Sequence, residues 1–470
     1  MTYIYILLSL GLLASLLLIA DDWKRGLWIC ILVGFLQDPV RKLIPGEPVM
    51  VTISVGGILL LTAIIAMLRN ISISPLQMHE WTNRLSVPFG AFLLILIFQC
   101  FHTWIRYENL LLACVGFISY LTPFITMVLA YRAALERPDY IVKLLKFYTA
   151  ASLVVSATIY FEYLGMDWQV LGEVGKGIVI YDLGTAFRGM TGLMRSPDIA
   201  AWHMATAIGF FVILVLTVGR SRNVVIGGLI VLAILGAGIL TGRRKIILQV
   251  LIFLSVYWVL LVAFSRGSRR LGGLAIMLAI LGYALLLGAE RGGSQDSAFF
   301  DLYVERGKTA FEDVEDRVQS LGISSIGWAY NRAGFFGAGA GVATQGARFF
   351  REWSFGLEGP AEGGFGKITA ELGVPGLAIT LWLLIAMCRV MWRQLKVIAT
   401  DPIAAKLAYG FIGLAIANFI AFMVATQVFG DLFVLMLLGV IIGSFFALGH
   451  HCSRMTGQET RPAGSQQEVV

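Results

Sequence analysis

The stretch Glu290–Gly373 reads ERGGSQDSAFFDLYVERGKTAFEDVEDRVQSLGISSIGWAYNRAGFFGAGAGVATQGARFFREWSFGLEGPAEGGFGKITAELG and is the only long polar interruption in an otherwise apolar sequence. It is crowded with charged residues, glycines and aromatics, whereas both flanks are nearly charge-free runs of membrane-spanning length. A loop this long between two spans is uncommon and is usually functional. We therefore expect the chemistry of the protein to lie in this loop, against a membrane-embedded scaffold.

The composition predicts a polytopic membrane protein. Of the 470 residues, 58% are hydrophobic and only 14% are charged, whereas a soluble domain carries roughly a quarter charged residues. The apolar runs are continuous, which predicts helices rather than the alternating strands of a membrane barrel. The formal charge of +7 is attributed to cytoplasmic loops, so no nucleic-acid partner is expected. The five cysteines form no CxxC pair, which argues against a disulfide framework or a cysteine metal site.

We predict an all-α fold with about twelve transmembrane helices and one large helical extracytoplasmic loop. The expected parts are N-terminal spans in residues 1–289, the loop with the active site in 290–373, C-terminal spans in 374–450 and a disordered cytoplasmic tail in 451–470. The expected spans are Tyr3–Ala20, Met50–Leu68, Val87–Phe101, Leu110–Tyr131, Ile141–Leu164, Ile199–Val218, Val224–Leu240, Ile246–Phe264, Leu271–Leu287, Val374–Met391, Leu407–Val428 and Leu432–Leu448. The run Leu27–Leu36 is short for a span and is interpreted as a half-helix or interfacial hairpin, with a thirteenth span as the open alternative.

Basic residues predict the orientation of the spans. Those within Arg132–Lys143, Arg220–Arg222, Arg266–Arg270 and Arg389–Lys396 fall on one side, which the positive-inside rule makes cytoplasmic. The loops Gly165–Pro197, Thr241–Lys245 and Glu290–Gly373 then share the opposite side. Within the large loop, apolar periodicity predicts helices at Ala298–Leu321, at Ser324–Arg332, and from about Glu362 towards the next span.

Arginines gather on that outer side, at Arg188, Arg195, Arg243, Arg244, Arg306, Arg317 and Arg332. A guanidinium group stays charged and binds phosphate oxygens in pairs. Several such groups could hold a lipid-linked diphosphate and stabilise it as a leaving group. The alternative is that they pair with lipid phosphates or with nearby acidic residues, namely Asp182, Asp198, Asp313 and Asp316.

Glu362, in GPAEGGFGKITAELG, is the second candidate. It could act as a general base that takes the proton from an attacking sugar hydroxyl, or it could cap the start of a helix. The glycine run Gly334–Gly341 matches no phosphate fingerprint and predicts a tight turn that brings backbone close to the lipid surface or to substrate. His203 is expected to be a satisfied buried side chain. No metal motif occurs, so neither a metal nor another cofactor is expected.

At these residues the sequence resembles the O-antigen ligase / O-antigen polymerase (Wzy/WaaL-like) family of bacterial surface-polysaccharide glycosyltransferases. The carrying segments are Arg188-Gly-Met-Thr-Gly through Arg195-Ser-Pro-Asp198, the Thr241-Gly-Arg-Arg turn, Arg317 with Trp328 and the Gly337-Ala-Gly-Ala-Gly341 run, and Glu362 through Glu371-Leu-Gly-Val-Pro-Gly376. The resemblance covers Tyr160 to Leu381. It implies a metal-independent, GT-C-like glycosyltransferase of the bacterial inner membrane, which transfers a glycan from undecaprenyl diphosphate to an acceptor sugar hydroxyl on the periplasmic face.

The resemblance also implies roles for the candidate residues. Arginines at the positions of Arg317 and of Arg243 or Arg244 would grip the diphosphate, and Glu362 would be the possible base. Together with the outer arginines described above, this predicts Glu362 and Arg317 as catalytic residues and Arg188, Arg195, Arg243, Arg244 and Arg306 as diphosphate-binding residues. The ligases carry a histidine where this chain has Glu362, which favours a polymerase of exopolysaccharide or O-antigen repeats over a ligase that uses a lipid A-core acceptor. The implied partners are the lipid-linked donor, a glycan acceptor, the lipid bilayer and other polysaccharide-assembly proteins. A transporter or flippase of a lipid-linked glycan and a non-catalytic scaffold are the other interpretations, and the lack of an internal repeat argues against a transporter.

Overall fold

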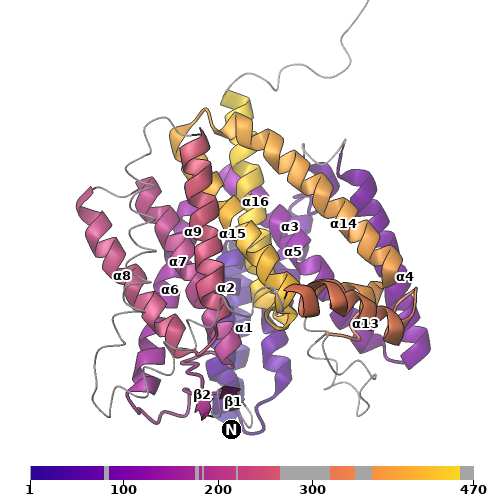
Figure 1. Ribbon diagram of the computed structural model, residues 1–470, viewed down its shortest axis with the longest axis horizontal. Coiled ribbons are helices and arrows are strands. Elements are labelled where there is room, and N and C mark those ends of the chain that lie inside the picture. The colour runs from indigo at the N-terminus through magenta and orange to yellow at the C-terminus, as the bar shows by residue number, and fades with distance from the viewer. Residues whose placement is uncertain are drawn as a thin grey trace, which may run out of the picture.

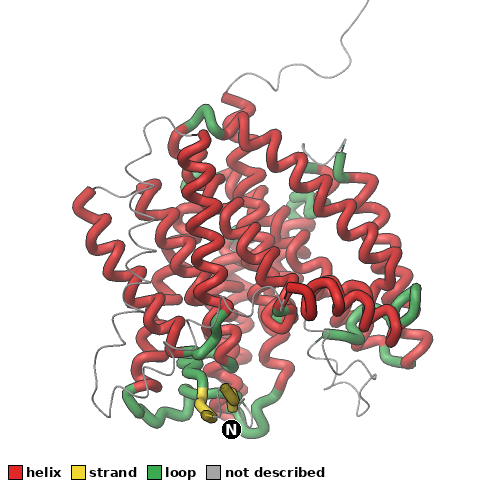
Figure 2. Tube along the Cα trace, viewed as in Figure 1, coloured by secondary structure: helices red, strands yellow, loops and turns green. Residues whose placement is uncertain are grey.

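The computed structural model describes residues 2–78, 84–174, 179–182, 185–218, 221–264, 318–344 and 363–455. Long helices form a bundle whose connections gather at its two ends (Figures 1 and 2). The helices are α1 (Thr2–Asp21), α2 (Arg25–Leu43), α3 (Ser54–Leu68), α4 (Ser86–Tyr107), α5 (Leu110–Glu136), α6 (Tyr140–Tyr163), α7 (Pro197–Val218), α8 (Ser221–Leu240), α9 (Lys245–Phe264), α13 (Ser324–Ala333), α14 (Gly364–Ile398), α15 (Pro402–Val424) and α16 (Leu432–Met455).

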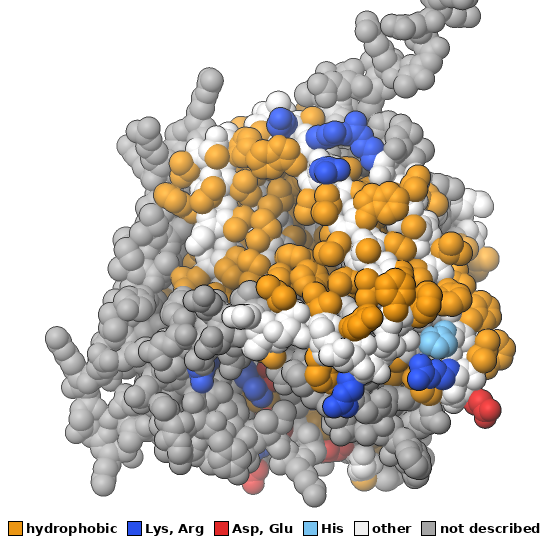
Figure 3. Space-filling view, turned by 45° about the vertical axis from the view of Figure 1, so that its right-hand side comes forward, with side chains coloured by type: hydrophobic (Ala, Val, Ile, Leu, Met, Phe, Trp, Pro, Cys, Tyr) orange, Lys and Arg blue, Asp and Glu red, His pale blue; other side chains and the backbone are white. Residues whose placement is uncertain are grey.

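Within these residues, nine helices are long and apolar enough to cross a membrane, and the apolar segments Ser9–Asp21 and Ile226–Leu240 are shorter. Figure 3 shows a broad hydrophobic band across one face, with Lys and Arg side chains above it and both acidic and basic side chains below it. The chain is therefore a helical, multi-pass membrane protein. The predicted span Leu271–Leu287 and the residues of the tail from 456 onward lie outside the described residues.

The interpretation of Leu27–Leu36 as a half-helix or hairpin is wrong. This run belongs to α2, a single helix of 19 residues that is about 28 Å long at the usual helical rise. Just before α2 begins, the carbonyl of Lys24 accepts a hydrogen bond of 2.6 Å from Tyr140, the first residue of α6. Near its other end, Lys42 contacts the loop that follows α6. Helix α2 therefore runs from one end of the bundle to the other.

Helices α7 and α16 form the centre of the bundle. In their apolar windows 89% and 78% of residues are buried, against 28% in α14. Glycines let α16 approach α5 closely, because a Cβ on Gly439 would lie 2.4 Å from the Pro123 carbonyl oxygen and one on Gly443 would lie 2.2 Å from that of Met127. Small residues four apart are a common way to bring membrane helices together.

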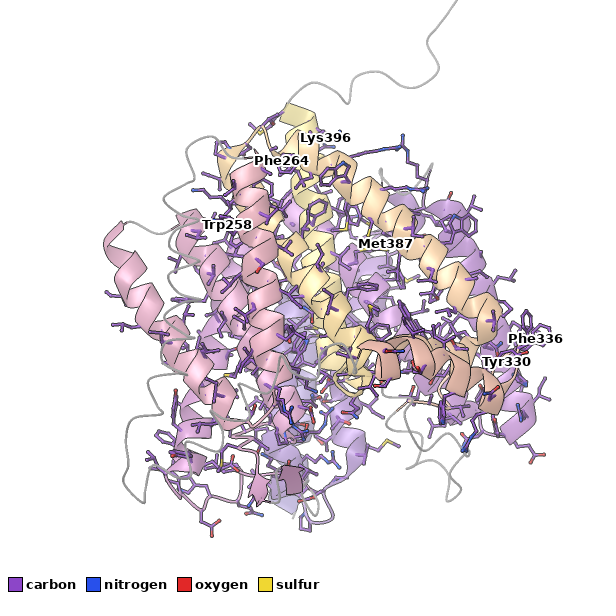
Figure 4. All side chains as sticks on the ribbon, in the orientation of Figure 1. Trp258, Phe264, Tyr330, Phe336, Met387 and Lys396 are labelled. Carbon is purple, nitrogen blue, oxygen red and sulfur yellow. The ribbon has the colours of Figure 1, made fainter. Side chains whose placement is uncertain are left out.

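The two ends of the bundle carry different loops. Phe264 at the end of α9 and Lys396 near the end of α14 lie at one end (Figure 4). The strands β1 (Val179–Asp182) and β2 (Thr185–Arg188) lie at the other, where they pair antiparallel with Val179 opposite Arg188. The backbone N–H of Met190 donates to the carbonyl of Leu240 at 3.0 Å, so the described parts of loops 165–197 and 241–245 share one end, as predicted. The hairpin itself departs from the purely helical expectation.

The described part of the large loop contains two of its three predicted helices. Helix α13 matches the prediction of Ser324–Arg332, and α14 begins at Gly364, close to the predicted start. Gly373, with φ of 74°, interrupts the helical backbone of α14, which the sequence does not reveal. Most of the predicted helix Ala298–Leu321 lies outside the described residues, and its last residues belong to a π-helical turn, Val318–Ile323.

Candidate functional site

The loop after β2, residues 189–196, is held in place by two charged side chains from neighbouring helices. Glu162, at the end of α6, accepts hydrogen bonds from the backbone N–H groups of Thr191 at 2.8 Å and Gly192 at 2.7 Å. Lys42, at the end of α2, donates to three backbone carbonyls, those of Val170 at 3.0 Å, Gly192 at 2.9 Å and Met194 at 2.8 Å. Buried charges that make several hydrogen bonds stabilise one conformation, so this loop has a fixed shape.

Arg195 lies at the end of this loop, in a buried ion triad. Its Nη1 is 3.2 Å from Asp38 of α2, and its Nη2 is 2.7 Å from Asp431, which precedes α16. Burial by itself would lower the pKa of Arg195, but the charges of Asp431 and Asp38 outweigh burial and raise it above its ordinary value. Asp431 also accepts a hydrogen bond of 2.7 Å from the backbone N–H of Phe433 and so caps α16. The triad therefore ties the loop to two helices and engages both ends of the guanidinium fork.

The turn between α8 and α9 carries the outer cations of the Thr241-Gly-Arg-Arg-Lys motif. Gly242 has φ of 67°, a left-handed conformation that favours glycine. The Nη2 of Arg243 lies 3.0 Å from Asp198, the second residue of α7, and Lys245 forms an ion pair with the same carboxylate. One carboxylate thus faces two cations. The Nε and Nη2 atoms of Arg243 are buried and make no aligned hydrogen bond in the described part of the chain.

Arg188 is followed in the chain by Gly189, which packs against this turn. A Cβ on Gly189 would lie 2.4 Å from the carbonyl oxygen of Thr241, so the end of β2 presses against the α8–α9 turn. The side chain of Arg188 is exposed, and its Nη2 would lie 2.6 Å from a Cβ on Gly172. Arg188 and Arg243, which are distant in sequence, therefore come from two loops in direct contact.

The other candidates have different positions. Arg306, Arg317 and Glu362 lie outside the described residues. Arg244 is half-buried in the same turn as Arg243. Arg332, on α13, lies with its guanidinium carbon 5.8 Å from the ring centre of Trp328, a cation–π contact.

The glycine run 334–341 forms the predicted tight turn, with positive φ at Gly334, Gly337, Gly339 and Gly341, and its backbone packs against α14. Its approach to lipid or substrate stays a prediction. The backbone N–H of Ala338 donates to Ala370 at 2.7 Å, and that of Gly339 donates to Glu371 at 3.2 Å. In return the N–H of Val374 donates to Phe335 at 2.9 Å. The run thus supplies the hydrogen bonds that α14 loses at Gly373.

His203 is fully buried, as expected, and its Nδ1 lies 2.7 Å from the hydroxyl of Tyr148. Its Nε2 has no hydrogen-bond partner within the described ranges. The expectation of a satisfied side chain therefore holds for one ring nitrogen.

The sequence interpretation missed four buried or half-buried charges that shape this end of the bundle, at Asp38, Lys42, Glu162 and Asp431. Their position at the edges of apolar runs was a usable signal, because ionisable residues next to spans are costly and are retained for a purpose.

No protein-family model matches the sequence, and a search of curated proteins finds no match. The fold therefore defines the class: the chain is a helical membrane protein. At one end it carries a group of cations on neighbouring loops, the cationic loop cluster, which consists of Arg188, Arg243, Arg244 and Lys245. Among the described residues, no group of three or more His, Cys, Asp or Glu side chains could hold a metal ion.

Proposed function

We propose that this protein is a membrane glycosyltransferase that moves a glycan from undecaprenyl diphosphate to an acceptor sugar hydroxyl, and that it polymerises exopolysaccharide or O-antigen repeat units. The observation that carries the proposal is the contact between the end of β2 and the α8–α9 turn. This contact brings the chain just after Arg188 against the turn that carries Arg243 and Lys245, at one end of an apolar bundle. Two of the short motifs that resemble the O-antigen ligase / polymerase family, Arg188–Asp198 and Thr241–Arg244, fall at this contact.

The charge of this cluster suits a diphosphate on a lipid. Arg243 and Lys245 share one carboxylate, Asp198, so together they keep a net positive charge. The Nε of Arg243 is buried and has no hydrogen-bond partner among the described residues, whereas its Nη2 is paired with Asp198. A diphosphate whose prenyl chain lies in the bilayer would meet these donors at the edge of the membrane, where guanidinium and ammonium groups bind phosphate oxygens strongly.

The proposed reaction needs no cofactor. The acceptor hydroxyl attacks the anomeric carbon of the lipid-linked sugar, a new C–O bond forms, and the bond to the diphosphate oxygen breaks. The diphosphate leaves with the bonding electron pair, and the cations stabilise its developing charge. The hydroxyl proton passes to a base, which we assign to Glu362 with Arg317 as a further diphosphate contact. Arg195, whose guanidinium is held by Asp38 and Asp431, acts in this scheme by fixing the loop.

The orientation of the bundle is part of the proposal. Arg25, Arg137, Arg393 and Lys396 lie near one end, and the positive-inside rule makes that end cytoplasmic. The cationic loop cluster then faces the periplasm of the bacterial inner membrane, where the lipid-linked donor and the acceptor meet.

Purified protein in lipid nanodiscs should lengthen or transfer a lipid-linked oligosaccharide without a nucleotide sugar. Arg243→Gln should reduce the rate about 10²- to 10³-fold, as loss of one charged donor to a developing anion does, while the melting temperature stays close to that of the native protein. Arg393→Gln, an exposed position near the far end of α14, is the matched control and should keep its rate. A native rate in Arg243→Gln would refute this site. Movement of donor across the bilayer without any product would favour the transporter interpretation instead.

A further inference from the structure

Two neighbouring phenylalanines within the glycine run 334–341 are exposed. Phe335 is 51% exposed and Phe336 is 62% exposed, and their rings contact edge to face with centres 5.2 Å apart. The protein holds their backbone, because the carbonyl of Phe335 accepts from the N–H of Val374 at 2.9 Å and that of Phe336 accepts from the side chain of Gln99 at 2.5 Å. The fold therefore fixes this backbone and leaves two large apolar side chains outside, at the edge of the molecule where Tyr330 also lies (Figure 4).

These rings lie at the level of an exposed apolar stripe on α4, a helix that is long and apolar enough to cross a membrane. Four exposed residues recur at intervals of four, three and four, which places them on one helix face, namely Leu94, Phe98, Phe101 and Ile105. Gln99, which binds the carbonyl of Phe336, belongs to the same stretch of α4. The two phenylalanines therefore extend an apolar surface that already faces lipid.

Helix α13 borders the two phenylalanines with polar and aromatic side chains. Its buried face contains Ser325, which packs on the start of α14, since a Cβ on Gly366 would lie 2.7 Å from the Cβ of Ser325. On its other face Tyr330, Asn331 and Arg332 are exposed. Tyrosine and arginine are typical of the boundary between hydrocarbon and water, so α13 has the surface expected of a helix at that boundary.

A second cation borders the same place from α4. The hydroxyl of Thr103 donates to the carbonyl of Ala340 in the glycine run at 2.9 Å. Arg106 follows Thr103 by three residues, is exposed, and lies with its guanidinium carbon 5.4 Å from the ring centre of Tyr107. Guanidinium groups bind phosphate oxygens strongly. The apolar rings are thus bordered by cations whose charge complements that of phospholipid head groups.

We propose that α13 and the glycine run form an interfacial anchor. Phe335 and Phe336 insert among the acyl chains of the leaflet at this end of the bundle, and Arg106, Tyr330 and Arg332 lie among its phosphate head groups. Insertion removes two aromatic rings from water, which is favourable in proportion to the apolar area covered. The anchor fixes the depth of residues 318–344 relative to the bilayer, whether or not the protein transfers a glycan.

Spin labels measure this depth directly. In full-length protein without the five native cysteines, a nitroxide is placed at Phe336→Cys, in nanodiscs of phosphatidylethanolamine and phosphatidylglycerol. Collisions with oxygen, which dissolves in lipid, are compared with collisions with a water-soluble nickel complex. The references are Phe98→Cys on the stripe of α4 and Trp168→Cys in the loop after α6, both exposed positions. We expect the label at 336 to collide with oxygen rather than nickel, as at 98, and a label at Asn331→Cys to collide with nickel.

Two results would overturn the anchor. Nickel collisions at 336 as frequent as those at 168 would place the rings in water. Protection of 336 from both reagents would mean that protein covers the rings, either another part of this chain or a partner. If Phe336→Cys melts below the native protein, Phe335→Cys provides the same readout from the adjacent ring.

Removal of the rings tests whether they set the depth of α13. The variant Phe335→Ser/Phe336→Ser, labelled at Asn331→Cys, should show more frequent nickel collisions than the same label with both rings present. Phe98→Ser, which removes one exposed ring from α4, is the matched control and should leave the label at 331 unchanged. Equal nickel collisions with and without Phe335 and Phe336 would show that these rings do not anchor α13.

Discussion

The hydroxyl of Tyr120 on α5 donates a hydrogen bond of 2.7 Å to Glu371 on α14. Glu371 lies just before the interruption of α14 at Gly373, and its other oxygen is bound by Ala343 and Thr344. One carboxylate therefore joins α5, α14 and the segment after the glycine run. The broken helix and the loop that completes it are held as one unit.

Replacement of Glu371 by alanine should destabilise the protein. It would leave the donors of Tyr120, Ala343 and Thr344 without their acceptor, and unsatisfied buried polar groups cost about 1–3 kcal/mol each. We expect a clear fall in the melting temperature in detergent. Glu136→Ala, which removes only the 41%-exposed partner of a surface ion pair, is the control and should change stability by less than about 1 kcal/mol. Equal melting of the two variants would show that the Glu371 network is unimportant.

Gly373 should tolerate no side chain. Its φ of 74° is strained for other residues, and a Cβ would lie 2.5 Å from the carbonyl oxygen of Phe335. Gly373→Ala should therefore cost more than about 2 kcal/mol, since φ of 74° with ψ of −177° lies in a region that is almost restricted to glycine and strains other residues by about 1–3 kcal/mol. Gly327→Ala, in α13 with nothing near its Cβ position, should be neutral or stabilising by up to about 1 kcal/mol. The melting temperatures of both variants measure these stability costs. Similar melting temperatures would argue against a rigid interruption of α14 at Gly373.

Replacement of Arg195 should reduce stability, whereas replacement of Arg243 should reduce transfer activity. Arg195→Met leaves the carboxylates of Asp38 and Asp431 buried without their cation, and breaking such a pair costs about 3–5 kcal/mol. We expect this variant to melt well below the native protein, and the double variant Asp38→Asn/Arg195→Met to recover part of the loss. Arg243→Met should keep most of its stability and lose transfer. A stable Arg195→Met variant would remove the positioning role assigned to the triad.

The two ends of the bundle should face opposite sides of the membrane. Trp168, after α6, and Thr400, between α14 and α15, are exposed at opposite ends. In a variant without the five native cysteines, an impermeant thiol reagent should label Trp168→Cys on intact spheroplasts. It should label Thr400→Cys only after the membrane is opened. The reverse pattern would invert the proposed orientation.

Transfer should not depend on a divalent metal. The proposed leaving group is stabilised by side-chain cations, so activity in a large excess of EDTA should equal that in buffer alone. A loss of activity that Mg²⁺ or Mn²⁺ restores would contradict the scheme.

Apolar continuity made the helical elements predictable. Runs of membrane-spanning length such as Leu110–Tyr131 lie within helices of the structure, and the periodic segment Ser324–Arg332 forms α13. Helix α2 was misjudged because Asp38 and Lys42 interrupt its apolar pattern. Their partners, Arg195 and the carbonyls of the loop after β2, come from a distant part of the chain.

The candidate site was less predictable, for a related reason. The sequence locates arginines on one side of the bundle, but it cannot tell which of them meets a carboxylate. Arg195 and Arg243 both occur in short outer segments, yet the first faces two carboxylates and the second shares one with Lys245. The role of the glycine run could not be predicted from the sequence either. Its hydrogen-bond partners are backbone groups that α14 leaves free at Gly373, and the positive φ of Gly373 leaves no pattern in the sequence.

The close packing of Gly439 and Gly443 on α5 has a consequence for biogenesis. The ribosome makes α5 early and α16 only after α6 through α15 have been produced. During synthesis, the surface of α5 around Pro123 and Met127 must therefore wait in the bilayer, covered by lipid or by the insertion machinery. A nascent chain arrested before Leu432 would lack the helix that fills the centre of the bundle, and a quality-control protease should recognise it as unfinished.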